Sequence, residues 1–97
     1  MTDRTPLLEL LHRALPALKE RYPIRSLGLF GSFARGDMSE SSDLDILVDF
    51  ARPVSLSRFL ALEEELGQLT GRNVDLVSRE SLKPHIGRNV LRDLVPV

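Results

Sequence analysis

The sequence has no cysteine among its 97 residues, so disulfides, thiol catalysis and thiolate zinc sites are excluded. It also has no apolar run approaching the roughly 20 residues that a membrane-spanning helix needs. The first four residues lack the basic-then-apolar order of a signal peptide. These absences predict a soluble, cytoplasmic protein with no membrane partner.

An excess of basic residues is missing as well. Thirteen lysines and arginines face 14 aspartates and glutamates, which gives a net charge of −1. Proteins that hold nucleic acid by charge alone need a clear basic excess, so this balance argues against such binding. The hydrophobic share of 42% and the charged share of 28% are typical of globular proteins. We therefore expect residues 1–97 to form a single domain.

The hydrophobic spacing predicts alternating helices and strands. The expected elements are a helix over residues 5–22, a strand over 24–30, a glycine-bracketed turn over 31–36, a polar loop over 37–42, a strand over 43–50, a helix up to about 69, a strand over 73–78 and a helix over about 84–94. This order predicts an α/β or α+β fold, in which a small mixed sheet of about three strands is backed by helices.

The central helix has recognisable ends. Ser55 or Ser57 can cap its beginning, and Gly71 can supply its stop. The residues expected to face inward are Leu56, Phe59, Leu60, Leu66 and Leu69.

Two aspartates mark the strand over residues 43–50. Asp43 and Asp45 are two residues apart, so on a strand they leave the same face with Cα atoms about 6.6 Å apart. Such carboxylates repel each other, and a divalent cation would relieve the repulsion by binding both. Taken alone, the pair fits a solvated strand that carries solubilising charge equally well.

A glycine-serine turn favours a functional role for the two aspartates over a solvated strand. Gly31 and Ser32 directly follow the strand over 24–30, where a backbone without a side chain can approach a phosphate closely. Asp37 and Met38 replace the Lys-Ser/Thr of a Walker A loop, which excludes a P-loop NTPase. Asp75, on another strand, can face the same cleft. Together these features indicate metal-assisted phosphoryl or nucleotidyl transfer.

The stretch Leu29–Gly36, followed by Ser42–Val48, resembles the signature of the polymerase-beta-type nucleotidyltransferase superfamily. More narrowly, it is similar to the minimal nucleotidyltransferases, the MNT-type antitoxins. Leu66, Gly71 and the stretch Val74–Leu76 match a further conserved stretch of that group. The resemblance covers roughly residues 5–94.

The resemblance implies site residues. Gly31 and Ser32 would bind the triphosphate of the nucleotide, while Asp43 and Asp45 would hold two magnesium ions. Asp75 would share one metal and take the proton from the acceptor.

Two further residues match the family. Arg35 corresponds to the family's arginine near the nucleotide, although a surface arginine that neutralises the acidic loop is an equal alternative. Ser42 is expected at the nucleotide site, where it would orient the start of the strand.

The resemblance also implies an activity and a partner. Members of the group are implicated in transferring AMP from ATP to a tyrosine hydroxyl of a HEPN-type toxin ribonuclease, with which they form a hetero-oligomer. The chain ends soon after the catalytic core, so a free nucleic-acid substrate is not expected. The main alternative is an antitoxin that neutralises its partner by binding alone.

Two other enzymes rank lower. An aminoglycoside-type nucleotidyltransferase normally needs a second domain. A haloacid-dehalogenase-type phosphatase is rejected, because the apolar run here follows Asp43 and the chain is too short.

Overall fold

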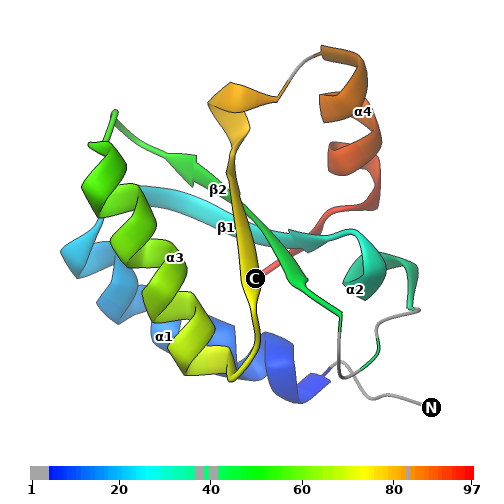
Figure 1. The fold of residues 1–97 in the computed structure, drawn as a ribbon, viewed down its shortest axis with the longest axis horizontal. Helices are drawn as coiled ribbons and strands as arrows, with labels where there is room; N and C mark the ends of the chain where they lie inside the picture. Colours follow the sequence, from blue (N-terminus) through cyan, green and yellow to red (C-terminus); the bar gives the residue numbers. More distant parts are fainter. Residues whose placement is uncertain (1–4, 37–38, 40–41, 83) are drawn as a thin grey trace.

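The computed structural model describes residues 5–36, 39, 42–82 and 84–97. Of the loop predicted over 37–42, residues 37, 38, 40 and 41 therefore lie outside the described part. The elements in chain order are α1 (Thr5–Arg21), β1 (Ile24–Phe30), α2 (Ser32–Arg35), β2 (Leu44–Phe50), α3 (Leu56–Thr70), β3 (Val74–Ser78), the 3-10 turn η1 (Arg79–Ser81), α4 (Pro84–Asp93) and β4 (Val95–Pro96) (Figure 1).

The sheet is mixed and has the strand order β3-β2-β1-β4. β1 pairs antiparallel with both β2 and β4, whereas β2 and β3 are parallel and are connected through α3. This confirms the predicted class, a small mixed sheet backed by helices. The fourth strand was not predicted, because two residues, Val95 and Pro96, are too short to show an alternating pattern.

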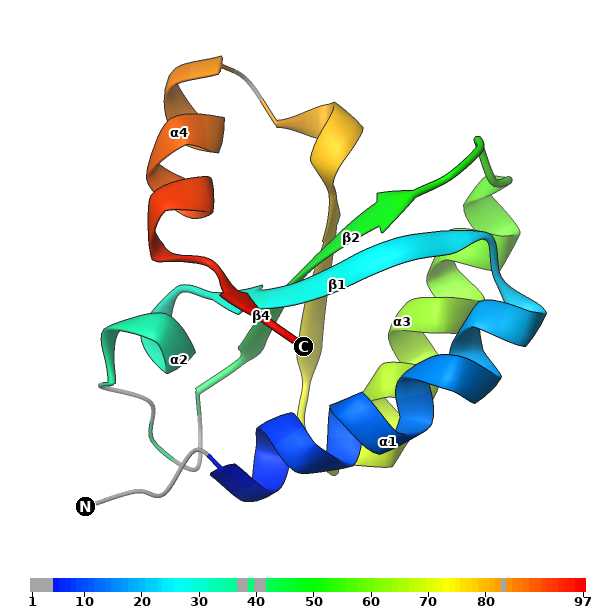
Figure 2. The ribbon, with the colours of Figure 1, turned by 180° about the vertical axis from the view of Figure 1, so that it is seen from behind.

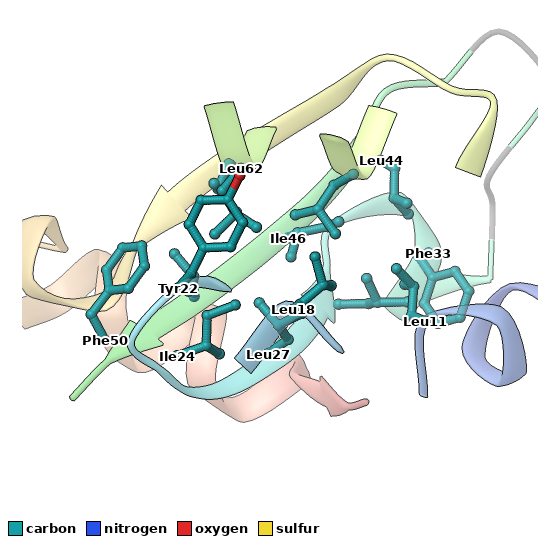
Figure 3. Packing of buried hydrophobic residues seen from close by; sticks show 14 residues of the cluster. Leu11, Leu18, Tyr22, Ile24, Leu27, Phe33, Leu44, Ile46, Phe50 and Leu62 are labelled. Atoms are coloured by element: carbon teal, nitrogen blue, oxygen red, sulfur yellow. The ribbon is translucent and has the colours of Figure 1, made fainter. Parts of the chain in front are cut away.

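One face of the sheet carries the main core. Leu44, Ile46 and Val48 alternate along β2 and are fully buried. They pack with α1 and α3, which lie side by side beneath this face (Figures 1 and 2). Figure 3 shows the interdigitated side chains, among them Leu11 and Leu18 of α1. This packed layer is the rigid support for everything on the opposite face.

The opposite face is covered at its centre. Leu47 points away from the main core, yet only 3% of its surface is exposed. Gly28 of β1 lies between Leu27 and Leu29, which face the main core, so it belongs to this second face too. A Cβ at Gly28 would lie 2.5 Å from Cδ1 of Leu94, directly after α4. The C-terminal segment therefore packs onto the sheet here.

The ends of α3 are as expected, but its inward face is different. The Ser55 hydroxyl accepts a hydrogen bond from the amide of Arg58 at 3.3 Å, and Gly71 ends the helix in the left-handed conformation. Leu56 and Leu60, predicted to face inward, are 72% and 50% exposed. For these two residues the prediction was wrong, because the inward stripe runs through the buried Leu62, which lies on a different side of the helix. Phe59, Leu66 and Leu69 face the core as predicted.

Candidate active site

The turn after β1 is built by two glycines. Gly31 has φ 67° and ψ −137°, and the single-turn helix α2 begins at the next residue, Ser32. Gly36 ends this helix with φ 79°. Phe33, only 1% exposed, anchors α2 in the core. The chain thus folds back sharply where the sequence predicted a glycine-bracketed turn, and it presents the Gly31 backbone at the end of the strand.

Gly31 lies directly against Asp45. A Cβ built on Gly31 would be only 2.0 Å from Oδ2 of Asp45, and the preceding residue, Phe30, pairs with Asp45 across the sheet. Any side chain at position 31 would therefore displace this carboxylate, in addition to the strain of a positive φ. The glycine turn and the carboxylate strand form one site.

The parallel pairing of β2 and β3 brings the third carboxylate, that of Asp75, to the site. Asp45 of β2 is in register with Asp75 of β3, so both side chains leave the same face of the sheet. Asp43 is exposed and precedes β2, which begins at Leu44 rather than at Asp43 as predicted. Asp45 is half-buried, and Asp75 is exposed. All three aspartates thus lie at one end of the sheet.

The electrostatics confirm that these groups are close. Burial, followed by the negative charges of Asp75 and Asp43, raises the pKa of the Asp45 carboxyl above its ordinary value of 3.8. The Arg35 guanidinium acts on the same pKa in the opposite direction. The structure therefore brings four of the predicted site residues within electrostatic reach of one another.

The donor set suits a hard divalent cation without forming a closed cage. Within the described ranges, no three histidine, aspartate or glutamate side chains are grouped so that they could hold a metal ion as they stand. Magnesium, however, is usually bound through one or two carboxylates, water and substrate phosphates rather than by an all-protein cage. The mutual repulsion at Asp45 is the kind that such a cation relieves. Asp43, Asp45 and Asp75 thus fit magnesium by charge and ligand type.

Ser42 and Arg35 have different surroundings. The Ser42 hydroxyl accepts a hydrogen bond from the Ser39 amide at 3.0 Å, and the Ser42 amide donates to the Ser39 carbonyl. Arg72 donates from Nη1 to the same carbonyl, so this turn is tied to the segment before β3. Arg35 is exposed at the end of α2. Nucleotide contact by either residue stays a prediction.

One supporting residue gave no signal in the sequence. Oε2 of Glu63, on α3, accepts a hydrogen bond from the Leu76 amide at 2.9 Å. Leu76 directly follows Asp75, and β3 is an edge strand of the sheet. Glu63 therefore holds the strand that carries the third carboxylate. Only the packing of α3 against β3 brings the two residues together, so neither periodicity nor a motif could have revealed the contact.

Comparison with known proteins decides the family. Residues 11–97 match the model of the nucleotidyltransferase domain. A protein adenylyltransferase MntA from Thermococcus cleftensis is 51% identical over 80 residues, which cover 82% of this chain and 81% of that protein. The chain belongs to the nucleotidyltransferase domain family. The resemblance to the minimal nucleotidyltransferases is thereby confirmed.

Solved structures support this assignment. A structure described as a minimal nucleotidyltransferase superimposes on this nucleotidyltransferase domain with a TM-score of 0.81 and 36% identity, covering 95% of this chain and 94% of that one. The structure of a tri-AMPylated Shewanella oneidensis HEPN toxin in complex with MNT antitoxin matches with a TM-score of 0.61 and 22% identity, covering 96% and 66%. The second similarity shows a shared fold. No helix among the described residues is both long and apolar enough to cross a membrane.

Proposed function

We propose that this nucleotidyltransferase transfers AMP from ATP to a hydroxyl of a HEPN-type toxin ribonuclease and thereby neutralises it. The observation that carries the proposal is the contact of Asp45 with Gly31 and its register with Asp75, which joins a phosphate-accessible turn to a carboxylate cluster. The 51% identity to a protein adenylyltransferase supports a protein acceptor. The relative solved with an AMPylated HEPN toxin supports the partner.

In this proposal the backbone of Gly31 and the hydroxyl of Ser32 bind the triphosphate. Asp43, Asp45 and Asp75 would hold magnesium. Two bound magnesium ions would neutralise the phosphate charge and polarise the reacting phosphoryl group. Arg35, which already acts on Asp45 electrostatically, is placed to add positive charge at the same end of the sheet.

The transfer step then follows from the acidic groups. Asp75 accepts the proton of the acceptor hydroxyl as the oxygen of that hydroxyl forms a bond to the α-phosphorus of ATP. The bond between the α-phosphorus and the bridging oxygen breaks, and pyrophosphate leaves with that bonding pair. Asp75 is exposed, as a group that meets the hydroxyl of another protein must be.

The remaining parts of the proposal concern the setting. A net charge of −1 offers little general attraction for nucleic acid, so the acceptor is a protein that brings its own binding surface. We propose a hetero-oligomer of the two proteins in the cytoplasm, with residues 1–97 acting as one domain. The alternative is an antitoxin that masks its partner without chemistry.

The decisive experiment incubates the purified chain with a HEPN-domain partner, magnesium and ATP labelled at the α-phosphate. We expect label on the partner, and a loss of about 10²–10⁴-fold in rate for Asp75→Asn, the usual contribution of a general base. Asp49→Asn is the matched control, because Asp49 lies on the same face of β2 but pairs with Arg25 and Arg79.

Two outcomes contradict the proposal. Equal labelling by wild type and Asp75→Asn would remove Asp75 from the transfer step. Full protection from the toxin by an Asp75→Asn chain that transfers no label would show that masking suffices.

A further inference from the structure

A pair of exposed leucines marks a surface outside the proposed active site. Leu56 and Leu60 of α3 are 72% and 50% exposed, and they lie one turn apart on the helix. Leu56 lines a hollow of about 310 Å³ with Phe59 and Ser78. Leu60 lines a neighbouring hollow of about 630 Å³ with Val74. The surface of α3 and β3 that carries these two separate hollows is here called the α3–β3 groove.

The edge of β3 restricts what can dock in this groove. An exposed edge strand normally invites another strand to pair with it. Here the Leu76 amide, at the middle of β3, already donates to the Glu63 carboxylate at 2.9 Å. A partner strand would have to break this hydrogen bond, so the groove favours an occupant that binds through its side chains, such as a helix.

The charge around the leucines defines the chemistry of that occupant. Glu63 and Glu64 line the larger hollow, and Glu80 lines the smaller one. Among the described residues that line the two hollows, Arg72 is the basic one, and its Nη1 donates a hydrogen bond to the Ser39 carbonyl. The exposed side chains of Leu56 and Leu60, with carboxylates beside them, complement apolar side chains flanked by lysine or arginine.

The groove also leads to the carboxylate end of the sheet. Its larger hollow is lined by Ser42 and Asn73, and Asn73 is two residues before Asp75. The Asn73 carbonyl accepts a hydrogen bond from the amide of Leu44, which lies between Asp43 and Asp45. The groove therefore ends near the start of β2 and β3, on the face of the sheet opposite to the one that the side chains of Asp45 and Asp75 leave.

We propose that the α3–β3 groove docks a basic amphipathic helix of the acceptor protein. This inference rests on the proposed function, whose acceptor protein the groove would bind. The length of β3, from Val74 to Ser78, is about 13 Å at the usual strand rise. That length corresponds to about nine helical residues, which places two or three apolar side chains on one face.

The test measures the affinity of the purified chain for a purified HEPN-domain partner by biolayer interferometry. One variant combines Leu56→Ser with Leu60→Ser, and another combines Glu64→Lys with Glu80→Lys. Leu10→Ser on α1, where the leucine is 37% exposed, is the matched control. We expect each groove variant to lose at least about tenfold in affinity, with the charge variant more affected at low salt.

Calorimetric titration with ATP and magnesium checks that each variant retains its fold and its nucleotide site. A photo-crosslinker on Leu60→Cys, which is unique because the chain has no cysteine, then identifies the contacted segment of the partner. A helix with apolar residues flanked by lysine or arginine supports the proposal.

Several results would overturn it: wild-type affinity in both groove variants, a crosslinked segment without basic residues, or crosslinking to a second copy of this chain with a matching dimer in light scattering. If the groove variants label the partner at the wild-type rate when the partner concentration is limiting, the docking proposal is wrong and the proposed transfer stands. Weakened binding in the groove variants, with no label transfer by any chain, would refute the transfer and leave the groove standing.

Discussion

At the scale of single residues, the contact between Gly31 and Asp45 links two parts of the site that are 14 positions apart. The carboxylate oxygen occupies the space that a side chain at position 31 would need. Gly36 also has a positive φ, but within the described part of the chain no atom other than those of its chain neighbours lies within 4 Å of its would-be Cβ. Substitution of Gly36 therefore causes backbone strain alone, whereas substitution of Gly31 causes both strain and a collision with the carboxylate.

This difference gives a matched prediction. Gly31→Ala should abolish most transfer, because it adds a collision with Asp45 to the strain, whereas Gly36→Ala suffers strain alone, of about 1–2 kcal/mol. Ser32→Ala should lose a single hydroxyl contact of about 1–2 kcal/mol, and so should be milder than Gly31→Ala. Transfer rates under identical conditions test the order. Equal damage from the two glycine variants, or a more severe Ser32→Ala, would show that the turn does not support the site as described.

The raised pKa of Asp45 has a consequence for stability. Because the folded protein binds the Asp45 proton more tightly than the unfolded chain does, the contribution of Asp45 to the free energy of unfolding should fall as the pH rises from about 3.8 through the folded pKa. Asp45→Asn should remove this fall and stabilise the protein at pH 7 in the presence of EDTA. Urea denaturation between pH 3.5 and 7, at steps of about half a unit, measures the effect.

Added magnesium should raise the free energy of unfolding above its value in EDTA. It should stabilise wild type by binding the folded state, and stabilise Asp45→Asn less. Asp49→Asn should show no gain at neutral pH, because Asp49 is held by two arginines. A difference in the free energy of unfolding between wild type and Asp45→Asn that stays constant with pH across this window would contradict the assignment.

At the scale of elements, Glu63 connects α3 to the strand that carries Asp75. Its carboxylate accepts the amide proton of Leu76, and a hydrogen bond to a charged group typically contributes about 1.5–3 kcal/mol. Glu63→Ala should therefore destabilise the protein within that range and slow transfer through a less ordered β3. Glu63→Gln keeps an oxygen acceptor and should recover part of both losses.

Hydrogen exchange at the Leu76 amide is the direct measurement. Faster exchange in Glu63→Ala, with partial restoration in Glu63→Gln, is the expected pattern. If Glu63→Ala leaves the exchange rate of that amide at its wild-type value, the hydrogen bond has no role in ordering β3.

At the scale of the whole molecule, the C-terminal segment packs against the second face of the sheet at Gly28. A Cβ there would be 2.5 Å from Leu94, and overpacking of this kind costs about 1–3 kcal/mol. Gly28→Ala should lower the free energy of unfolding by that amount. In a Leu94→Ala background the same change should cost much less, because the clashing side chain is absent. Four denaturation curves complete this cycle, and additive losses would show that Leu94 does not pack on Gly28.

The sequence alone was enough for the local features of this protein. The Gly31-Ser32 turn and the spacing of Asp43 and Asp45 depend on residues close together in the chain, where conformational preference and alternation act directly. The Ser55 cap and the Gly71 stop of α3 are local in the same way, and both were predicted. Together with the hydrophobic spacing of the other elements and the family resemblance, these features sufficed to predict the fold class and to name the candidate site residues.

Only the tertiary structure decided how these pieces meet. The register that places Asp75 opposite Asp45 depends on how α3 carries the chain from β2 to β3. The same packing leaves Leu56 and Leu60 exposed and brings Glu63 to Leu76, while the return of the C-terminal segment adds β4. Each outcome depends on contacts between residues distant in sequence, and hydrophobic periodicity carries no information about which distant element a residue meets.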